Sequence, residues 1–105
     1  MELWTHAYSA PRGITKAAEA AEAGGWAGLS VVDSQNLSGD AFIALAMAAT
    51  VTKRLKLQTG VTNPITRAAA TLAAAAASVQ SISKGRMVVG IGRGDSALAH
   101  LGRAP

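Results

Sequence analysis

The sequence predicts an α/β fold with parallel strands, arranged as the first three and a half βα units of a (β/α)8 TIM barrel. Short apolar runs rich in β-branched residues recur at intervals of roughly thirty residues, the spacing of parallel crossover units. Each interval holds a segment of high helix propensity. A full barrel takes about 250 residues, whereas this chain has 105. Residues 1–105 are therefore assigned to one incomplete barrel domain.

An open, doubly wound sheet shows the same alternation and is the alternative architecture. The last residues favour the barrel. After the fourth predicted strand the chain enters a glycine-rich loop, begins a helix over 97–101 and stops at Pro105, with no packing partner for that helix. We therefore expect an N-terminal portion of a larger barrel, and the functional predictions apply to that larger protein.

The first half of the sequence predicts two strands and a helix. Residues 3–8 are short and aromatic-rich, which is typical of a strand. Residues 15–23 have high helix propensity and are followed by Gly24, the residue type preferred after a helix. Residues 28–33 form the second predicted strand.

The second half repeats this pattern. Asp40 is a good N-cap for the next helix, and residues 55–61 form the third strand. Thr66 is predicted to cap a long alanine-rich helix that Gly85 ends. Residues 87–91 are almost continuously apolar, as expected of a strand buried on both faces. The apolar stripes of the two helices run through Phe42, Leu45, Ala46 and Ala49, and through Leu72, Ala75, Ala76, Val79 and Ile82.

Composition excludes several classes of protein. Half of the residues are apolar and 15% are charged, which argues against a disordered tail. The chain has no cysteine, so it is not a disulfide-stapled scaffold. Alanine supplies 24 of the 105 residues and contributes little apolar area. We therefore expect the isolated chain to be unstable or to associate.

The charge pattern does not predict a nucleic-acid partner. The net charge is +4, but the basic residues are scattered, and nucleic-acid binding requires clustering. The nearest cluster, residues 53–56, straddles the predicted end of a helix, where cations complement the helix dipole. The positive charge is instead expected to attract an acidic small molecule.

Membrane insertion and metal binding are not predicted either. The first residues lack the features of a signal peptide, and the longest uncharged stretch, between Arg67 and Lys84, is too short and too polar to span a bilayer. The default is a cytoplasmic protein. With only His6 and His100 and no cysteine, a zinc site is not expected.

Candidate binding residues follow the predicted strands. Parallel α/β folds bind ligands at the carboxyl ends of their strands. In this sequence all four ends carry polar side chains or glycine. They are His6, Tyr8 and Ser9 after the first strand, Asp33 to Asn36 after the second, Thr59 to Asn63 after the third, and Gly90 to Ser96 after the fourth.

Two of these residues are candidates for proton chemistry. Asp33 is the best candidate for a functional carboxylate, and the alternative is a turn residue that bonds its own loop. His6 alternates with Trp4 and Tyr8 and therefore shares their face of the sheet. Near a barrel mouth His6 would be a proton donor, whereas as a buried and satisfied histidine it would be inert.

Two motifs have unusual backbone requirements. The glycines of residues 90–95 are a poor fit to the dinucleotide fingerprint, because Asp95 stands where glycine is required and the motif follows the fourth strand. Three spaced glycines do allow a flat ligand to approach the backbone. In residues 59–64, glycine precedes a β-branched residue and Asn-Pro, which predicts a bulge or strained turn. The alternative is an ordinary strand exit.

Together these motifs resemble a known family. Val32-Asp33, Thr59-Gly60-Val61-Thr62-Asn63-Pro64 with Thr66-Arg67, and Gly90-Ile91-Gly92-Arg93-Gly94-Asp95-Ser96 are similar to the N-terminal part of luciferase-like flavin and deazaflavin oxidoreductases. The similarity is greatest to the coenzyme F420-dependent group that includes methylenetetrahydromethanopterin reductase. It extends over essentially the whole chain in the same order.

This resemblance implies a (β/α)8 barrel that binds a reduced deazaflavin or flavin at its carboxyl-terminal mouth. A non-proline cis peptide, which would fall at Gly60-Val61, backs the cofactor ring in this family. The implied cofactor-binding residues are Asp33, Gly60, Val61, Thr62 and Asn63 around the ring, with Gly94 and Asp95 beside it. The family's phosphate-binding elements and much of its substrate pocket come from later segments that this chain lacks.

The implied reaction is hydride transfer between C5 of coenzyme F420 and a carbonyl, imine or alkene carbon of a small-molecule substrate. The cofactor supplies the chemistry and the protein orients it. His6 or Asp33 would assist proton movement. Two alternatives remain: an FMN-dependent luciferase-like monooxygenase, and a non-catalytic half-barrel. A homo-oligomer is expected, without nucleic-acid or membrane partners.

Overall fold

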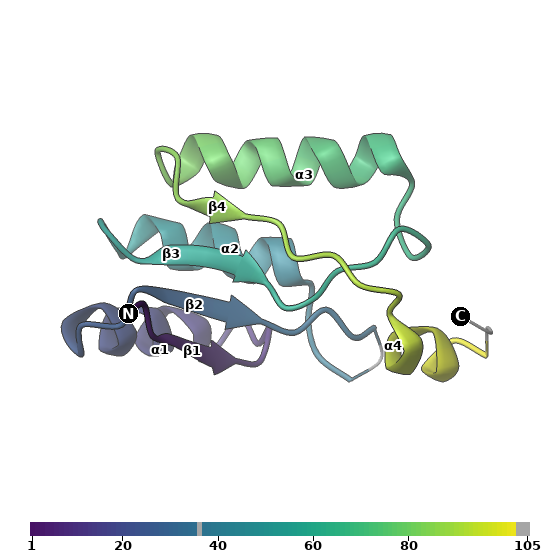
Figure 1. Ribbon diagram of the computed structural model, residues 1–105, viewed down its shortest axis with the longest axis horizontal. Helices are drawn as coiled ribbons and strands as arrows, with labels where there is room; N and C mark the ends of the chain where they lie inside the picture. The colour runs from purple at the N-terminus through teal and green to yellow at the C-terminus, as the bar shows by residue number, and fades with distance from the viewer. Residues whose placement is uncertain (36, 103–105) are drawn as a thin grey trace.

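The computed structural model describes residues 1–35 and 37–102 and consists of alternating strands and helices (Figure 1). This confirms the predicted alternation. The elements are β1 (Trp4–Ala7), α1 (Ile14–Ala23), β2 (Gly28–Val31), α2 (Ala41–Thr50), β3 (Lys56–Thr59), α3 (Ala69–Ile82), β4 (Met87–Val88) and α4 (Asp95–His100).

The sheet has the order β1-β2-β3-β4, and every neighbouring pair is parallel. Crossovers between parallel strands are right-handed, so three successive crossovers that step in the same direction place their helices on one face. Accordingly, α1, α2 and α3 lie side by side against the same face (Figure 1). A doubly wound sheet would reverse its strand order and have helices on both faces. The arrangement is therefore that of a barrel segment.

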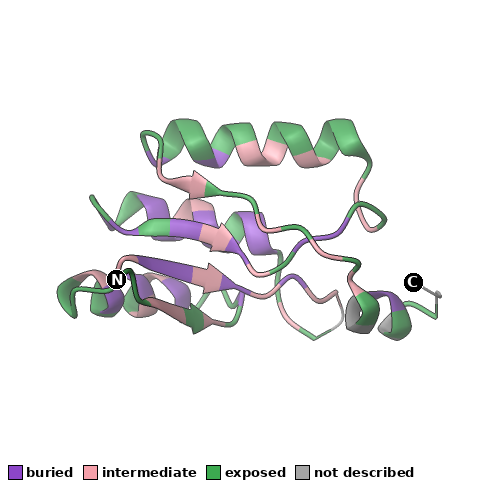
Figure 2. Ribbon diagram, viewed as in Figure 1, coloured by how far each residue is buried: buried purple, intermediate pink, exposed green. Residues whose placement is uncertain are grey.

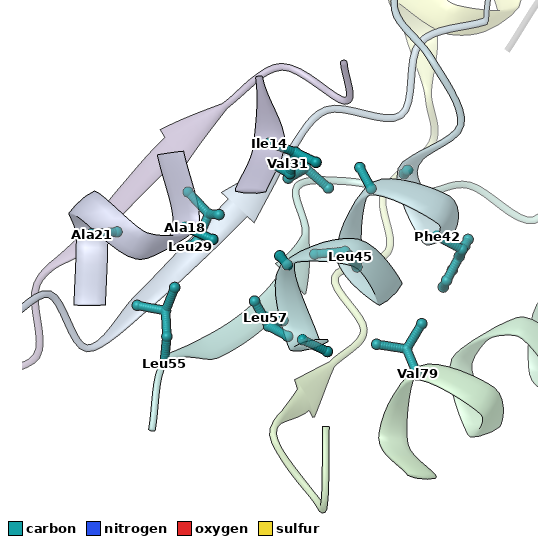
Figure 3. Packing of buried hydrophobic residues seen from close by; sticks show 14 residues of the cluster. Ile14, Ala18, Ala21, Leu29, Val31, Phe42, Leu45, Leu55, Leu57 and Val79 are labelled. Atoms are coloured by element: carbon teal, nitrogen blue, oxygen red, sulfur yellow. The ribbon is translucent and has the colours of Figure 1, made fainter. Parts of the chain in front are cut away.

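The hydrophobic core lies between the sheet and the three helices. Leu29 and Leu57 are paired in the register of β2 and β3, and both belong to the buried cluster that includes Leu45 of α2 (Figure 3). Figure 2 shows that the buried residues are concentrated on β2, β3 and α2, whereas the outer surface of α3 is exposed. The stripe predicted for α2 is confirmed for Phe42, Leu45 and Ala49.

Two charged side chains hold the pole of the sheet at which the strands begin. Glu22 Oε1 accepts hydrogen bonds from the backbone N–H groups of Lys53 (2.9 Å), Arg54 (2.6 Å) and Leu55 (3.0 Å). Burial acts to raise the pKa of Glu22, but these donors together outweigh it and lower that pKa from its ordinary value of 4.5. The carboxylate thus joins α1 to the turn between α2 and β3.

Arg86 binds the carboxyl ends of two helices at the same pole. Its guanidinium donates to the carbonyl oxygens of Ala49, Thr52, Leu55 and Ser83 and to the hydroxyl of Thr52. These distances lie between 2.7 and 3.1 Å. Carbonyls at helix ends lack intrahelical partners, and a cation there complements the helix dipole.

The prediction that the basic cluster at 53–56 complements the dipole of α2 is wrong. The helix ends at Thr50 and has no basic residue in its last turn. The cation that reaches the end of α2 is Arg86, which comes from a distant part of the chain.

The N-cap prediction for Asp40 is confirmed, since its carboxylate accepts from Phe42 N and Ile43 N at 2.9 and 3.0 Å. The prediction for Thr66 is wrong. The helix begins at Ala69, and its N-cap, Ala68, makes no side-chain cap. Asn63 Oδ1 accepts from the backbone N–H groups of Ile65 and Thr66, and this side-chain turn competes with an earlier helix start.

The fourth strand is shorter and more exposed than predicted. Ladder pairing covers Met87–Val88, followed by a single bridge between Thr62 and Ile91. Val88, Val89 and Ile91 are exposed rather than buried on both faces. The reason is that β4 is at the edge of the sheet, and that none of the helices in the described part of the chain covers the opposite face, which is called the bare face below. Ile82, at the end of α3, is likewise exposed.

The bare face and free edges predict that the isolated 105-residue chain associates in solution. An apolar hollow of about 360 Å³ lies between α3 and the β4 edge, and its lining includes Leu72, Ala76 and Ile91. Exposed strand edges and apolar surfaces of this kind favour intermolecular contacts. Light scattering after size-exclusion chromatography should give a mass that rises with concentration. A monodisperse monomer that melts cooperatively would contradict this expectation.

In the part of the chain that the structure describes, no helix has the length and hydropathy required to span a membrane.

Candidate functional site

A hollow of about 580 Å³ lies at the carboxyl ends of the strands. Its walls are the loops that follow β2, β3 and β4, the edge of the sheet at which the sequence predicts a ligand site. The lining residues are Val32, Asp33, Ser34, Gly60, Val61, Arg93, Gly94 and Asp95. Five of the predicted site residues are therefore brought together here.

One wall of the hollow consists largely of backbone. The Gly60-Val61 peptide is cis, as the family resemblance implies. Gly60 N donates to the carbonyl oxygen of Val31 at 2.7 Å, which fixes the wall to β2. A side chain at Gly60 would overlap Ser30 Oγ, and Val61 is 43% exposed. The wall thus presents a flat peptide and one apolar side chain.

Asp33 is a buried junction between the loops after β2 and β3. Its side chain has 0% exposure. Oδ1 accepts from Gln35 Nε2 at 2.9 Å, and Oδ2 accepts from Thr62 Oγ1 at 2.7 Å and from Arg67 Nη1 at 2.6 Å. Asp33 therefore does more than bond its own loop. Its role at the cofactor ring stays a prediction.

Arg67 joins two carboxylates. Its Nη1 binds Asp33, its Nη2 binds Asp40 Oδ2 at 2.9 Å, and its guanidinium carbon is 4.8 Å from the centroid of the Phe42 ring. Burial acts to lower the pKa of Arg67, but the two carboxylates outweigh it and raise that pKa above its ordinary value. Burial acts to raise the pKa of Asp40, and Ile43 N–H and Arg67 more than offset it, so that pKa is lowered.

Sequence reasoning did not single out Arg67 as a functional residue. In the sequence, Arg67 is one of the scattered basic residues and part of the motif after Asn63. The available signal was its place in a polar loop that follows a strand, since a cation there has two carboxyl-bearing loops within reach. Only the fold shows that Asp33 and Asp40 flank it.

Thr62 and Asn63 lie beneath the hollow and are fully buried. Thr62 N donates to Gly90 O at 2.8 Å, while its hydroxyl binds Asp33. Asn63 Oδ1 forms the turn described above, and Asn63 Nδ2 is buried with no hydrogen-bond partner among the described residues. Neither lines the hollow directly, and their contact with a cofactor stays a prediction.

The spaced glycines allow the loop after β4 to lie closely along the end of β3. A Cβ at Gly90 would overlap the carbonyl oxygen of Thr59, and one at Gly94 would be 2.7 Å from Asn63 Cβ. Gly94 also has a φ of +75°, which non-glycine residues rarely adopt. The structure thus gives these glycines a packing role between neighbouring loops, in addition to the ligand approach predicted from the sequence.

His6 lies on the bare face of the sheet at the edge of the site. It is paired in register with Ser30 and is exposed, so the alternative of a buried histidine is wrong. An added Cβ at Gly60 would be 3.8 Å from His6 Cε1, which places the imidazole beside the backbone wall. His6 is not among the residues that line the hollow, and its catalytic role stays a prediction.

Arg93 and Asp95 bring opposite charges to the outer wall. Arg93 Nε is 3.4 Å from Asp95 Oδ1, and their side chains are 75% and 63% exposed. Exposed pairs of this kind contribute little to stability. Within residues 1–35 and 37–102, no three His, Cys, Asp or Glu side chains are grouped so as to hold a metal ion.

A parallel sheet with its helices on one face, and a hollow built from the loops at its carboxyl end, are the features of a (β/α)8-barrel type of protein. The comparison with known families agrees. The profile of luciferase-like monooxygenases matches residues 2–102. The chain belongs to this family, and its fold is that of the N-terminal part of the barrel.

Similar proteins include 5,10-methylenetetrahydromethanopterin reductase of Methanolobus tindarius, which is 39% identical over 84 residues. The solved structure of the coenzyme F420-dependent tetrahydromethanopterin reductase of Methanopyrus kandleri superposes with a TM-score of 0.89 at 29% identity, over 96% of this chain. Monooxygenase RslO1 of Streptomyces bottropensis superposes with a TM-score of 0.76 at 27% identity, over 89% of this chain.

The chain spans only part of each relative. It covers 26% of the Methanolobus reductase, 30% of the Methanopyrus structure and 33% of RslO1. The resemblance inferred from the sequence motifs is confirmed, and it concerns the first βα units of these proteins.

Proposed function

We propose that the complete protein containing this chain is a coenzyme F420-dependent oxidoreductase acting on a small organic molecule. The observation that carries the proposal is the hollow at the carboxyl ends of the strands, which is lined by Gly60 and Val61 together with residues of the two neighbouring loops. Relatives named as F420-dependent and methylenetetrahydromethanopterin reductases support the choice of cofactor.

The residues around the hollow fit the ring of a deazaflavin. A volume of about 580 Å³ is within the range of small-molecule sites. Gly60 lines the hollow and has no side chain, so a planar group can lie against its backbone. The cations lining the hollow are limited to Arg93 among the described residues. The acidic tail of the cofactor is therefore assigned to segments outside this chain.

When bound, F420 supplies or accepts a hydride at C5 of its ring. The residues of this chain bind and orient that ring. Gly60 and Val61 support one face, and the apolar side chains of Val32 and Val61 exclude water. His6, exposed beside Gly60, is the group proposed to move a proton at its imidazole nitrogen.

FMN is the second candidate cofactor, favoured by the structural similarity to monooxygenase RslO1. Its ring is also a flat tricycle, which a backbone wall accommodates equally well. The third possibility, a non-catalytic half-barrel, predicts that neither cofactor binds.

A fluorescence titration of the complete protein with F420 and with FMN distinguishes these functions. We expect F420 to bind at least about tenfold more tightly than FMN, a difference of about 1.4 kcal/mol. Val61→Asp places an unpaired charge against the ring, which is unfavourable where water is excluded. This variant should bind F420 about tenfold more weakly than the unmodified protein does.

Val51→Asp is the matched control. Val51 is 38% exposed and follows α2, away from the hollow, whereas Val61 is 43% exposed and lines it. The control should bind F420 like the unmodified protein. Tighter binding of FMN would favour the monooxygenase alternative. Absence of binding by both cofactors, or equal effects of the two substitutions, would refute the proposed site.

A further inference from the structure

Arg67 contacts both loops that build the inner walls of the hollow without lining the hollow itself. Its side chain is 12% exposed and lies in the segment between β3 and α3. Nη1 is 2.6 Å from Asp33 Oδ2 and 3.5 Å from Thr62 Oγ1. We propose that Arg67 is a positioning residue for the cofactor pocket and that it acts through Asp33. This inference rests on the proposed function.

The groups that Arg67 binds adjoin residues that line the hollow. Asp33 stands between Val32 and Ser34, which both line the hollow, and Thr62 directly follows the Gly60-Val61 wall. The hydrogen bond from Thr62 Oγ1 to Asp33 Oδ2 therefore ties one wall to the other. Arg67 binds the same carboxylate oxygen and so fixes this tie.

The buried charge of Asp33 requires a cationic partner. The Asp33 side chain is fully shielded from solvent, and its remaining donors, Gln35 and Thr62, are neutral. A buried carboxylate that loses its cationic partner is strongly destabilised. Without Arg67, Asp33 turns toward water, and the loop that carries Val32 and Ser34 moves with it.

The shape of the Arg67 guanidinium lets it bind two carboxylates at once. One edge binds Asp33, while Nη2 binds Asp40, the N-cap of α2, and the group stacks on Phe42 in the first turn of that helix. Arginine holds two carboxylates in fixed directions, which the single ammonium of lysine does not. Arg67 thereby also anchors the end of the loop that leads from Asp33 to α2.

These contacts assign Asp33 a positioning role as well. Its carboxylate accepts three hydrogen bonds and has no exposed atom with which to exchange a proton with a ligand in the hollow. Of the two residues considered for proton movement, His6 is the exposed one.

The test compares Arg67→Met, Arg67→Lys, Asp33→Asn and the double variant Arg67→Met/Asp33→Asn in the complete protein. F420 affinity is measured by fluorescence, and thermal stability is measured with and without F420. Arg67→Met should weaken F420 binding about tenfold or more, and Arg67→Lys should recover part of that loss because it keeps the charge. The F420 affinity of the double variant should lie within about twofold of that of Asp33→Asn, because both substitutions break the same Arg67–Asp33 contact. Arg54→Met, an exposed arginine at the opposite pole, is the matched control and should bind normally.

Hydrogen exchange of residues 32–35 and 60–66 provides a readout that does not depend on the cofactor. Arg67→Met should accelerate exchange in both segments. If the unmodified protein binds no F420 but this acceleration occurs, the proposed function fails while the positioning role stands. Unchanged F420 affinity and exchange in Arg67→Met would overturn the inference. So would losses that simply multiply in the double variant, or an Arg67→Lys protein no better than Arg67→Met. Should Arg67→Met fail to fold, Arg67→Lys and Asp33→Asn decide by the same measurements.

Discussion

Replacing Arg86 by methionine is expected to lower the free energy of unfolding by about 3–5 kcal/mol. The guanidinium donates to four carbonyl oxygens and one hydroxyl at the ends of α2 and α3 and at the start of β3. Methionine fills much of the same space but leaves these part-buried oxygens without donors. Urea denaturation of the complete protein measures the loss.

Arg12→Met is the control for this change. Arg12 is exposed in the loop after β1, and its replacement should alter the stability by no more than about 0.5 kcal/mol. Arg86→Lys should be intermediate, because lysine keeps the charge but has fewer donors than the guanidinium. Equal stabilities of Arg86→Met and Arg12→Met would show that the contacts of Arg86 do not hold the helix ends.

Gly90→Ala should destabilise the complete protein by about 3 kcal/mol or more and abolish F420 binding. The new Cβ would overlap the carbonyl oxygen of Thr59 and be 2.8 Å from Gln58 Nε2. Backbone cannot give way as a flexible side chain would, since Gly90 O accepts from Thr62 N and Gly90 N donates to Thr59 Oγ1. The loop carrying Gly94 and Asp95 would then move away from the hollow.

The matched control is Gly13→Ala. An added Cβ at Gly13 meets no atom within 4 Å, and its φ is −109°, so alanine should change stability by less than about 1 kcal/mol. Thermal melts of both variants, followed by F420 titration, measure the two effects. A Gly90→Ala protein as stable as Gly13→Ala would mean that the ends of β3 and β4 do not lie in this close contact.

The sequence predicted the features that depend on neighbouring residues. Strand and helix alternation, the capping role of Asp40 and the buried face of α2 all follow from local periodicity and side-chain chemistry. The position of the site was also predictable, because parallel strands bring their carboxyl ends to one edge of the sheet. Asp33, Gly60, Val61, Gly94 and Asp95 do line one hollow there.

What the sequence did not predict depends on residues far apart in the chain. Glu22 binds backbone groups more than thirty positions away, and Arg86 and Arg67 reach across comparable separations. Their spacing carries no periodic signal. Thr66 does not cap the helix for a local reason, because the Asn63 side chain binds the backbone N–H groups of Ile65 and Thr66 in a turn that delays the start of the helix. The predicted burial of β4 on both faces was wrong, because burial depends on what covers the other side of the sheet.

Among the residues that the structure describes, the lining of the hollow comes from three successive loops, after β2, β3 and β4. Under the proposed function, the residues that hold the planar ring therefore all lie within residues 32–95. Because the strands follow one another in spatial order, a joint placed after α4 interrupts neither the strand pairing nor the lining of the hollow. Under the proposed function, recombination at that joint would exchange what the protein acts upon and leave the ring-binding residues unchanged.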